Sequence, residues 1–325
     1  MKNKNNFLRR GVAWLVLLCM SLCLLAGCEG PSADGGKIQI VCTTFPLYDW
    51  TKNIVGDSDS VSVELLVKSG TDLHSFQPSV ADIAKISSAD LLIHIGGSSD
   101  TWVQDAAKQA KGTELLTLSE IGGITLRSTD MEEEEMHGSA ADHHHHDFDE
   151  HIWLSLKNAM VCSQAIANAV SALDAENATL YAGNLEKYRA ELSSLDKEFE
   201  ELTQNAEQKP VIFADRFPFI YTFSDYDIGY LSAFSGCDTD AEASFETVIK
   251  LAEAVDKDQI KYILVTESSD KKIANQVISA SNSGNASVLI LDSMQSVTYA
   301  QIENGASYTA IMRSNLEVLE TVLAD

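Results

Sequence analysis

The sequence is short of basic residues. It has 23 Lys and Arg against 48 Asp and Glu, which gives a formal net charge of −25 at pH 7. So acidic a chain repels nucleic-acid phosphates, which excludes DNA or RNA binding as a main activity and favours cationic ligands. Only 6 of its 325 residues are cysteine, too few for a disulfide scaffold, while a hydrophobic share of 45% excludes a disordered chain.

Only one hydrophobic run is long, and it lies at the amino end. Residues 12–25 follow a basic start and are fewer than the roughly 20 apolar residues that span a bilayer, as is typical of a secretory signal. The run ends in Leu25-Ala26-Gly27-Cys28, which resembles a lipoprotein processing box with lipid on Cys28. A plain signal peptide or an anchor helix is the alternative. We expect a signal peptide over residues 1–27, a tether over 28–36, and a body lipid-anchored outside the cytoplasm at the bacterial membrane.

Three cysteines remain after the predicted cleavage site: Cys42, Cys162 and Cys237. An exported protein meets an oxidising environment, and three thiols can form at most one internal disulfide. The sequence leaves open which two would pair, if any.

Apolar segments alternate with helical patterns from residue 37 onward, and the alternation restarts after Pro210. Short apolar strands separated by helices predict parallel sheets with helices on both faces, an α/β fold class. We expect an N-terminal domain over residues 37–173 and a C-terminal domain over residues 208–325. The expected strands are Ile38–Thr43, Val61–Val67, Leu91–Ile95, Leu115–Leu118, Val211–Phe213, Ile228–Leu231, Tyr262–Val265 and Val288–Leu291.

A single long helix is expected over residues 174–207. Its apolar residues are spaced alternately four and three apart, which places them on one face: Tyr181, Leu185, Tyr188, Leu192, Leu195, Phe199 and Leu202. About 30 residues at 1.5 Å each make a rod of about 45 Å. The stripe can pack along both domains, so we expect a monomer; a coiled-coil dimer is the rival interpretation.

Histidine and acid dominate the stretch at residues 130–150. It holds nine acidic residues and no Lys or Arg, and its histidines are His137, His143, His144, His145 and His146. Imidazole nitrogens suit Zn, Cu and Ni, so the composition predicts a loop that collects divalent metal. A merely solvated acidic loop is the alternative.

Two further histidines lie where a fixed metal site is expected. His74 follows the strand at Val61–Val67, and His151 follows the acidic loop at the entry to a helix. Ligands of α/β sheets bind beyond the carboxyl ends of the strands. His94 lies inside an apolar strand, where a structural role is the better interpretation.

Several segments together resemble one family. They are Ile40-Val41-Cys42-Thr43-Thr44-Phe45-Pro46-Leu47-Tyr48-Asp49-Trp50, the His74 loop, the acidic histidine run and Asp149-Glu150-His151-Ile152-Trp153-Leu154. The chain thereby resembles the zinc-uptake substrate-binding lipoproteins of bacterial ABC transporters. That resemblance implies two (βα)4 domains bridged by one rigid helix, metal ligands at His74 and His151, and delivery of the metal to an ABC permease with its ATPase.

The second half departs from the family pattern. The family usually has a third ligand, His or Glu, before Asp-Ala-Phe, and the corresponding position here is Ala214, followed by Asp215. We therefore expect Asp215 as the third ligand, with a helix N-cap as its alternative role. The resemblance implies Asp292 as the fourth ligand, and Glu267 is a further carboxylate at the same sheet edge.

Zinc is the expected metal, with manganese or iron as the alternative. Two histidines with carboxylates would suit either metal, but intrinsic affinity favours Zn over Mn at one ligand set. Ligand imidazoles must be neutral, so we expect affinity to fall below about pH 6. No His-Glu-x-x-His or Gly-x-Ser-x-Gly motif occurs, so we expect no enzyme. A zinc hydrolase and a surface adhesin are the remaining alternatives.

Overall fold

The computed structural model describes residues 36–67, 73–110, 112–128, 148–204, 209–234, 237 and 243–324. Ile38–Asp325 form one compact unit, separate from Met1–Lys37. The predicted signal peptide, Cys28 and the histidines of the acidic loop lie outside the described residues, so these predictions remain untested.

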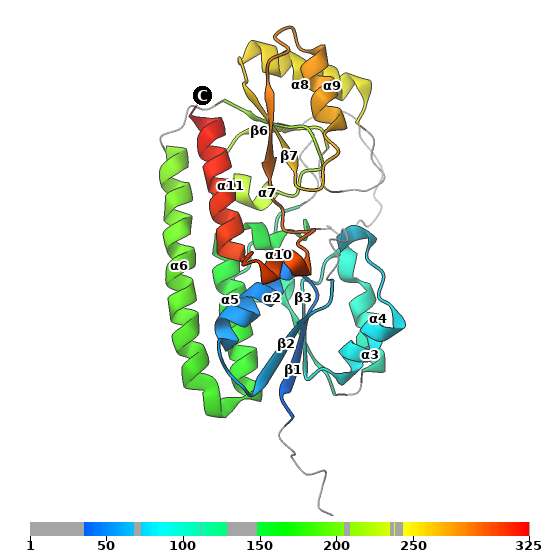
Figure 1. Ribbon diagram of the computed structural model, residues 1–325, viewed down its shortest axis with the longest axis vertical. Coiled ribbons are helices and arrows are strands. Elements are labelled where there is room, and N and C mark those ends of the chain that lie inside the picture. The colour runs from blue at the N-terminus through cyan, green and yellow to red at the C-terminus, as the bar shows by residue number, and fades with distance from the viewer. Residues whose placement is uncertain are drawn as a thin grey trace, which may run out of the picture. The chain divides into compact units, whose positions relative to one another are not determined.

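The first half contains a four-stranded parallel sheet. Its strands are β1 (Ile38–Cys42), β2 (Val61–Leu65), β3 (Leu91–His94) and β4 (Glu114–Thr117), in the order β2-β1-β3-β4. The helices are α2 (Phe45–Val55), α3 (Val80–Ser88), α4 (Trp102–Gln109) and α5 (Leu156–Leu173). Figure 1 shows β1 and β2 in blue, with α3 and α4 in cyan beside them.

The second half repeats this plan. Strands β5 (Val211–Phe213), β6 (Tyr230–Ser232), β7 (Tyr262–Thr266) and β8 (Ser287–Leu291) form a parallel sheet in the order β6-β5-β7-β8. The helices are α7 (Ile220–Asp225), α8 (Phe245–Lys257), α9 (Lys272–Ala280), α10 (Tyr299–Glu303) and α11 (Tyr308–Leu323). The two sheets therefore have the same strand order, with β5 in the place of β1 and β6 in the place of β2.

A hydrophobic cluster packs against each face of each sheet, and successive side chains of a central strand point alternately into one cluster or the other. In β1, Ile40 packs into the largest hydrophobic core, whereas Val41 packs into a second cluster with residues of α3 and α4. In β5, Phe213 joins the same large core, whereas Ile212 packs into a third cluster with residues of α8 and α9. One continuous core thus includes residues of both halves.

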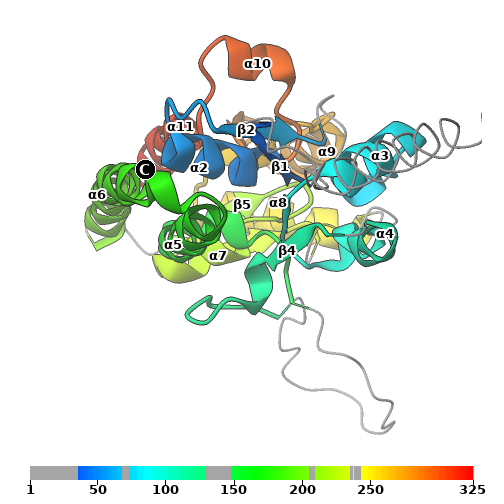
Figure 2. The same cartoon turned by 90° about the horizontal axis from the view of Figure 1, so that it is seen from below.

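The long helix α6 (Ala178–Gln204) has 27 residues and packs against α2, α5 and α11. Figure 1 shows α6 in green beside the red α11, and Figure 2 shows it beside α5. The first six residues of its apolar stripe are buried: Tyr181, Leu185, Tyr188, Leu192, Leu195 and Phe199. They belong to the large core, so this chain covers the stripe by itself and needs no coiled-coil partner for it.

The structure confirms the α/β fold class, with two parallel four-stranded sheets and one long helix. All eight strands overlap their expected ranges, although β6 begins at Tyr230, two residues later than expected. The pattern of Phe217–Phe223 predicts a helix over those residues, but α7 begins at Ile220, and the five-residue α10 was not expected from the sequence. Among the described residues, no helix combines the length and the apolar character that a membrane span requires.

We expect Leu192→Ala to destabilise the protein by about 2–5 kcal/mol, the usual cost of truncating a fully buried leucine. Leu192 is 0% exposed in the middle of α6. Lys187→Ala, at an exposed position of the same helix, is the matched control and should change stability by less than about 0.5 kcal/mol. Urea unfolding monitored by circular dichroism measures both variants. Equal midpoints for the two would contradict the packing of the stripe.

Candidate metal centre

His74 lies in a 3-10 turn, Leu73–Ser75, beyond the carboxyl end of β2. Buried Leu73 anchors the turn in the large core. The Nδ1 atom of His74 lies 2.8 Å from the Ser99 hydroxyl and 3.0 Å from Glu150 Oε1. A carboxylate only accepts hydrogen bonds, so Nδ1 of His74 carries a proton, and the neutral form of the ring then has its lone pair on Nε2.

Glu150 is held tightly in place beside His74. The Ser99 hydroxyl donates to Glu150 Oε1, and the Ser99 backbone N–H donates to Oε2 at 2.9 Å. Gly97 makes room for this carboxylate, because a Cβ at position 97 would lie 2.2 Å from Glu150 Oε2. The glycine is therefore needed for close approach, and the sequence gives no hint of it.

His151 is positioned by the residue two places before it. Asp149 Oδ1 accepts hydrogen bonds from the His151 backbone N–H at 2.9 Å and from Nδ1 at 2.8 Å. The side chain is buried, at 1% exposure, and its Nε2 has no hydrogen-bond partner among the described residues. Carboxylates that hold the second nitrogen of an imidazole are typical of metal-binding histidines.

Residues of the second half form hydrogen bonds with the segment that contains His151. Trp153 Nε1 donates to the Ser293 carbonyl at 2.9 Å, and the Tyr221 hydroxyl donates to the Asp149 carbonyl at 2.5 Å. The segment before α5 thus forms part of the contact between the halves as well as one side of the site.

The two imidazole rings lie close together, with their centroids 5.3 Å apart. A third residue, Cys237, joins them from the loop between β6 and α8. One potential ligand atom from each of His74, His151 and Cys237 lies within 4.8 Å of the other two. The structure therefore brings together the two histidines predicted from the sequence, with a thiol of the second half in place of a carboxylate.

The charges in this cluster are coupled. Burial opposes protonation of His74, but hydrogen bonds with Cys237 and Glu150 outweigh it and raise the pKa of His74 to about 9. Burial also opposes protonation of His151, yet the charges of Asp149 and Cys237 raise its pKa well above the ordinary value. Burial would raise the pKa of Cys237, but the charge of His151 lowers it. Burial disfavours ionised Glu150, but the hydrogen bond with His74 lowers its pKa to about 2.

The three carboxylates predicted from the sequence lie outside this cluster of close ligand atoms. Asp215 Oδ2 accepts from the Thr266 backbone N–H at 3.2 Å and from the Thr266 hydroxyl at 2.8 Å. Glu267 accepts from the backbone and the hydroxyl of Ser293. Asp292 Oδ1 accepts from the Met294 N–H, and burial together with the charge of Glu267 raises the pKa of Asp292 to about 6.

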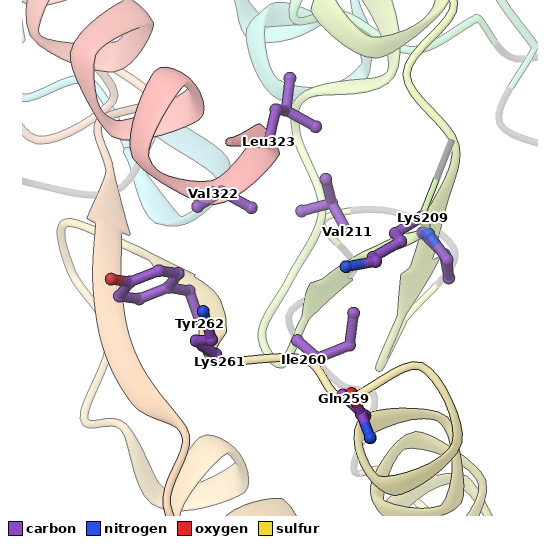
Figure 3. Close-up of a pocket in the computed structure, with 9 residues that line it drawn as sticks. Lys209, Val211, Gln259, Ile260, Lys261, Tyr262, Val322 and Leu323 are labelled. Carbon is purple, nitrogen blue, oxygen red and sulfur yellow. The ribbon is translucent and has the colours of Figure 1, made fainter. Parts of the chain in front are cut away.

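A pocket adjoins the cluster. His74 and Cys237 line it together with polar residues of the second half: Arg216, Thr266, Ser268, Gln295 and Ser296. A separate pocket lies at the amino ends of β5 and β7, where Lys209, Val211 and Tyr262 line it (Figure 3). Its lining includes no His, Cys, Asp or Glu, so it offers no side-chain ligand typical of a transition metal.

Cys237 is the site residue that the sequence did not reveal. Cys42, Cys162 and Cys237 are all buried free cysteines, so none of them forms a disulfide. One signal was available, because Cys237 follows the strand predicted at Ile228–Leu231, as His74 follows the one at Val61–Val67. A cysteine beyond a strand in an acidic loop deserves the same weight as a histidine there.

Comparisons with known proteins agree with this architecture. The profile of the ZnuA family, described as zinc-uptake complex component A, periplasmic, matches residues 40–322. The zinc-binding lipoprotein AdcA of Streptococcus pneumoniae (strain ATCC BAA-255 / R6) is 32% identical over 306 residues, which are 94% of this chain and 60% of AdcA. The chain thus spans less than two thirds of the length of AdcA.

Shorter relatives match along nearly their whole length. The high-affinity zinc uptake system protein ZnuA of Bacillus subtilis (strain 168) is 29% identical, with 95% of this chain and 98% of that protein covered. The crystal structure of the Zn(II)-bound ZnuA-like domain of Streptococcus pneumoniae AdcA is similar, with a TM-score of 0.71 at 27% identity, covering 89% of this chain and all of that domain. Since the family profile covers most of the chain, the protein belongs to the ZnuA family of periplasmic zinc-uptake components.

Proposed function

We propose that this protein captures Zn²⁺ between its two halves outside the cytoplasm and delivers it to an ABC permease for import. The observation that carries the proposal is the pair of buried imidazoles, His74 and His151, whose Nδ1 atoms each lie within 3.0 Å of a carboxylate oxygen. Because a carboxylate holds Nδ1, each ring can present its Nε2 lone pair to a metal ion once Nε2 has lost its proton. The names of the relatives, which refer to zinc binding and zinc uptake, support the same metal.

The ligand shell proposed from the predicted residues comprises His74, His151 and one carboxylate of the second half. Both oxygens of Asp215 accept hydrogen bonds, and so do both oxygens of Glu267. Asp292 accepts only through Oδ1 among the described residues, which leaves Oδ2 available. We therefore assign the carboxylate position to Asp292, with Asp215 and Glu267 holding the loops around it.

Capture and delivery are separate steps in this proposal. The acidic loop, with His137 and His143–His146, raises the local concentration of zinc, and the metal then passes to the buried site. A lipid on Cys28 would keep the monomer at the membrane, where a permease and its ATPase accept the loaded protein. The shared hydrophobic core and the hydrogen bonds of Trp153 and Tyr221 across the halves favour small adjustments over wide domain opening.

The proposal is tested by dialysing the mature protein against equimolar Zn and Mn and measuring bound metal by elemental analysis. We expect one tightly held zinc per chain, with further weakly held zinc on the acidic loop. Deleting residues 132–147 should remove the weak sites and keep the tight one. Preferential retention of manganese would contradict the assigned metal.

Delivery is tested in cells whose own copy of the gene is deleted. Growth in zinc-chelated medium should recover with the intact chain and fail to recover with His74→Ala at equal protein level. Recovery with His74→Ala would show that zinc transport does not depend on this site.

A further inference from the structure

The chemistry of the cluster goes beyond the ligands predicted from the sequence. We infer that Cys237 is a zinc ligand, so that a thiolate completes a site of two imidazoles, one sulfur and one carboxylate. This inference rests on the proposed zinc function and deepens it. It assigns the second half a soft ligand that selects zinc over manganese, since thiolates favour zinc whereas carboxylates and water suit manganese.

Geometry is the first support. The Cys237 sulfur belongs to a group of three potential ligand atoms that all lie within 4.8 Å of one another. Zinc–sulfur and zinc–nitrogen bonds of about 2.3 and 2.0 Å place the ligand atoms of a tetrahedral site roughly 3.5 Å apart. Only a small contraction therefore separates the observed cluster from a zinc-bound one.

The buried histidine provides a second, independent observation. His151 is 1% exposed, and its Nε2 has no hydrogen-bond partner among the described residues. A buried polar atom without a partner costs free energy, which a metal ion would recover. Asp149 already holds Nδ1, so Nε2 is the atom of His151 that remains for a metal ion in the group it forms with His74 and Cys237.

The fold supplies a third argument. His74 lies between β2 and α3, and Cys237 lies between β6 and α8. With strand orders β2-β1-β3-β4 and β6-β5-β7-β8, these are equivalent loops of the two halves. In each half, a serine then caps the following helix, Ser79 for α3 and Ser244 for α8. Equivalent loops thus each contribute one donor to the same cluster.

The other two cysteines differ in ways that make them useful controls. Cys42 lies in β1, and burial raises its pKa to about 12, although a hydrogen bond with Thr51 opposes this. Cys162 lies in α5, and burial raises its pKa as well. Neither Cys42 nor Cys162 belongs to the cluster. Cys237 does belong to it, and its pKa is lowered rather than raised.

Cobalt substitution tests the inference directly, because Co²⁺ bound to a thiolate shows a sulfur-to-metal charge-transfer absorption in the near ultraviolet. We expect this band in the wild-type protein and in Cys162→Ala, and its loss in Cys237→Ala. Zinc affinity should fall by about 100-fold or more in Cys237→Ala, as expected for loss of one of four ligands. The zinc-over-manganese preference should shrink in the same variant, while Cys162→Ala keeps both values.

The outcomes separate the two proposals. If the wild-type protein fails to bind zinc tightly, the proposed function falls. If it binds zinc tightly but its cobalt form lacks the charge-transfer band, the function stands and the thiolate ligand is refuted, even where Cys237→Ala weakens binding. The spectrum of the wild-type protein alone can therefore refute the thiolate ligand, whether or not a variant folds less well, and loss of the band in Cys237→Ala assigns it to this thiol rather than to Cys42 or Cys162.

Discussion

Replacing His151 with alanine should weaken zinc binding by about 100- to 1,000-fold. Structural zinc sites bind with roughly 10–16 kcal/mol, which over four ligands is roughly 2.5–4 kcal/mol each. His151 is the more buried of the two histidines, and Asp149 already fixes its tautomer. A competition titration against a chromogenic chelator measures the loss.

His94→Ala is the matched control for this prediction. His94 is also a buried histidine, but its Nε2 lies 2.9 Å from the Thr117 hydroxyl and its Nδ1 lies 3.3 Å from Asp100 Oδ2. It lies outside the cluster, so this variant should lose thermal stability and keep its zinc affinity. An equal loss of affinity in both variants would show that general destabilisation, not ligation, explains the effect.

Zinc affinity should rise steeply with pH across the neutral range. The contacts with Cys237 and Glu150 raise the pKa of His74 to about 9, so its imidazole carries a proton at pH 7 that zinc must displace. Below pH 9 each unit of acidification then costs about tenfold in affinity for this one proton. From pH 8 to pH 6 the expected fall is at least about 100-fold, because His151, whose pKa is also raised, has a proton to lose as well. The sequence alone suggested a fall only below about pH 6, because it did not reveal these partners.

Calorimetry tests this prediction by counting protons. Zinc titrations at pH 7 in buffers of different ionisation enthalpy should show at least one proton released per zinc bound. In a Glu150→Gln variant, His74 loses its carboxylate partner, so its pKa should drop and the affinity should depend less on pH. A flat affinity between pH 6 and pH 8 in the wild-type protein would contradict the raised pKa.

Local patterns were sufficient to predict the architecture. The alternating strands and the spacing of Tyr181 to Phe199 predicted both sheets and α6, because burial requires those periods whatever the partner. Helix α7 was placed too early, since Phe217 and Phe219 are core residues of the preceding loop and mimic a helical pattern. The short helix α10 has no buried residue, so no apolar pattern in the sequence predicted it.

The site was harder to predict, because its residues meet only through the fold. His74 and His151 could be chosen from their loop positions and neighbours. The role of Glu150 beside His74 depends on the space that Gly97 leaves, which no sequence pattern expresses. Cys237 was considered only as a possible half of a disulfide. Motif alignment placed Ala214 at the ligand position and so directed attention to the next residue, Asp215, whose oxygens accept hydrogen bonds from Arg216 and Thr266.

The matching strand order of the two sheets is what the duplication of one ancestral half would leave behind. Each half then has an equivalent loop, which in the proposed site contacts the ion from its own side. Evolution can exchange the donor on one copy, imidazole for sulfur or oxygen, while the other copy keeps the ion in place. Metal preference in such a protein can thus diverge by single substitutions, with no need to rebuild the scaffold.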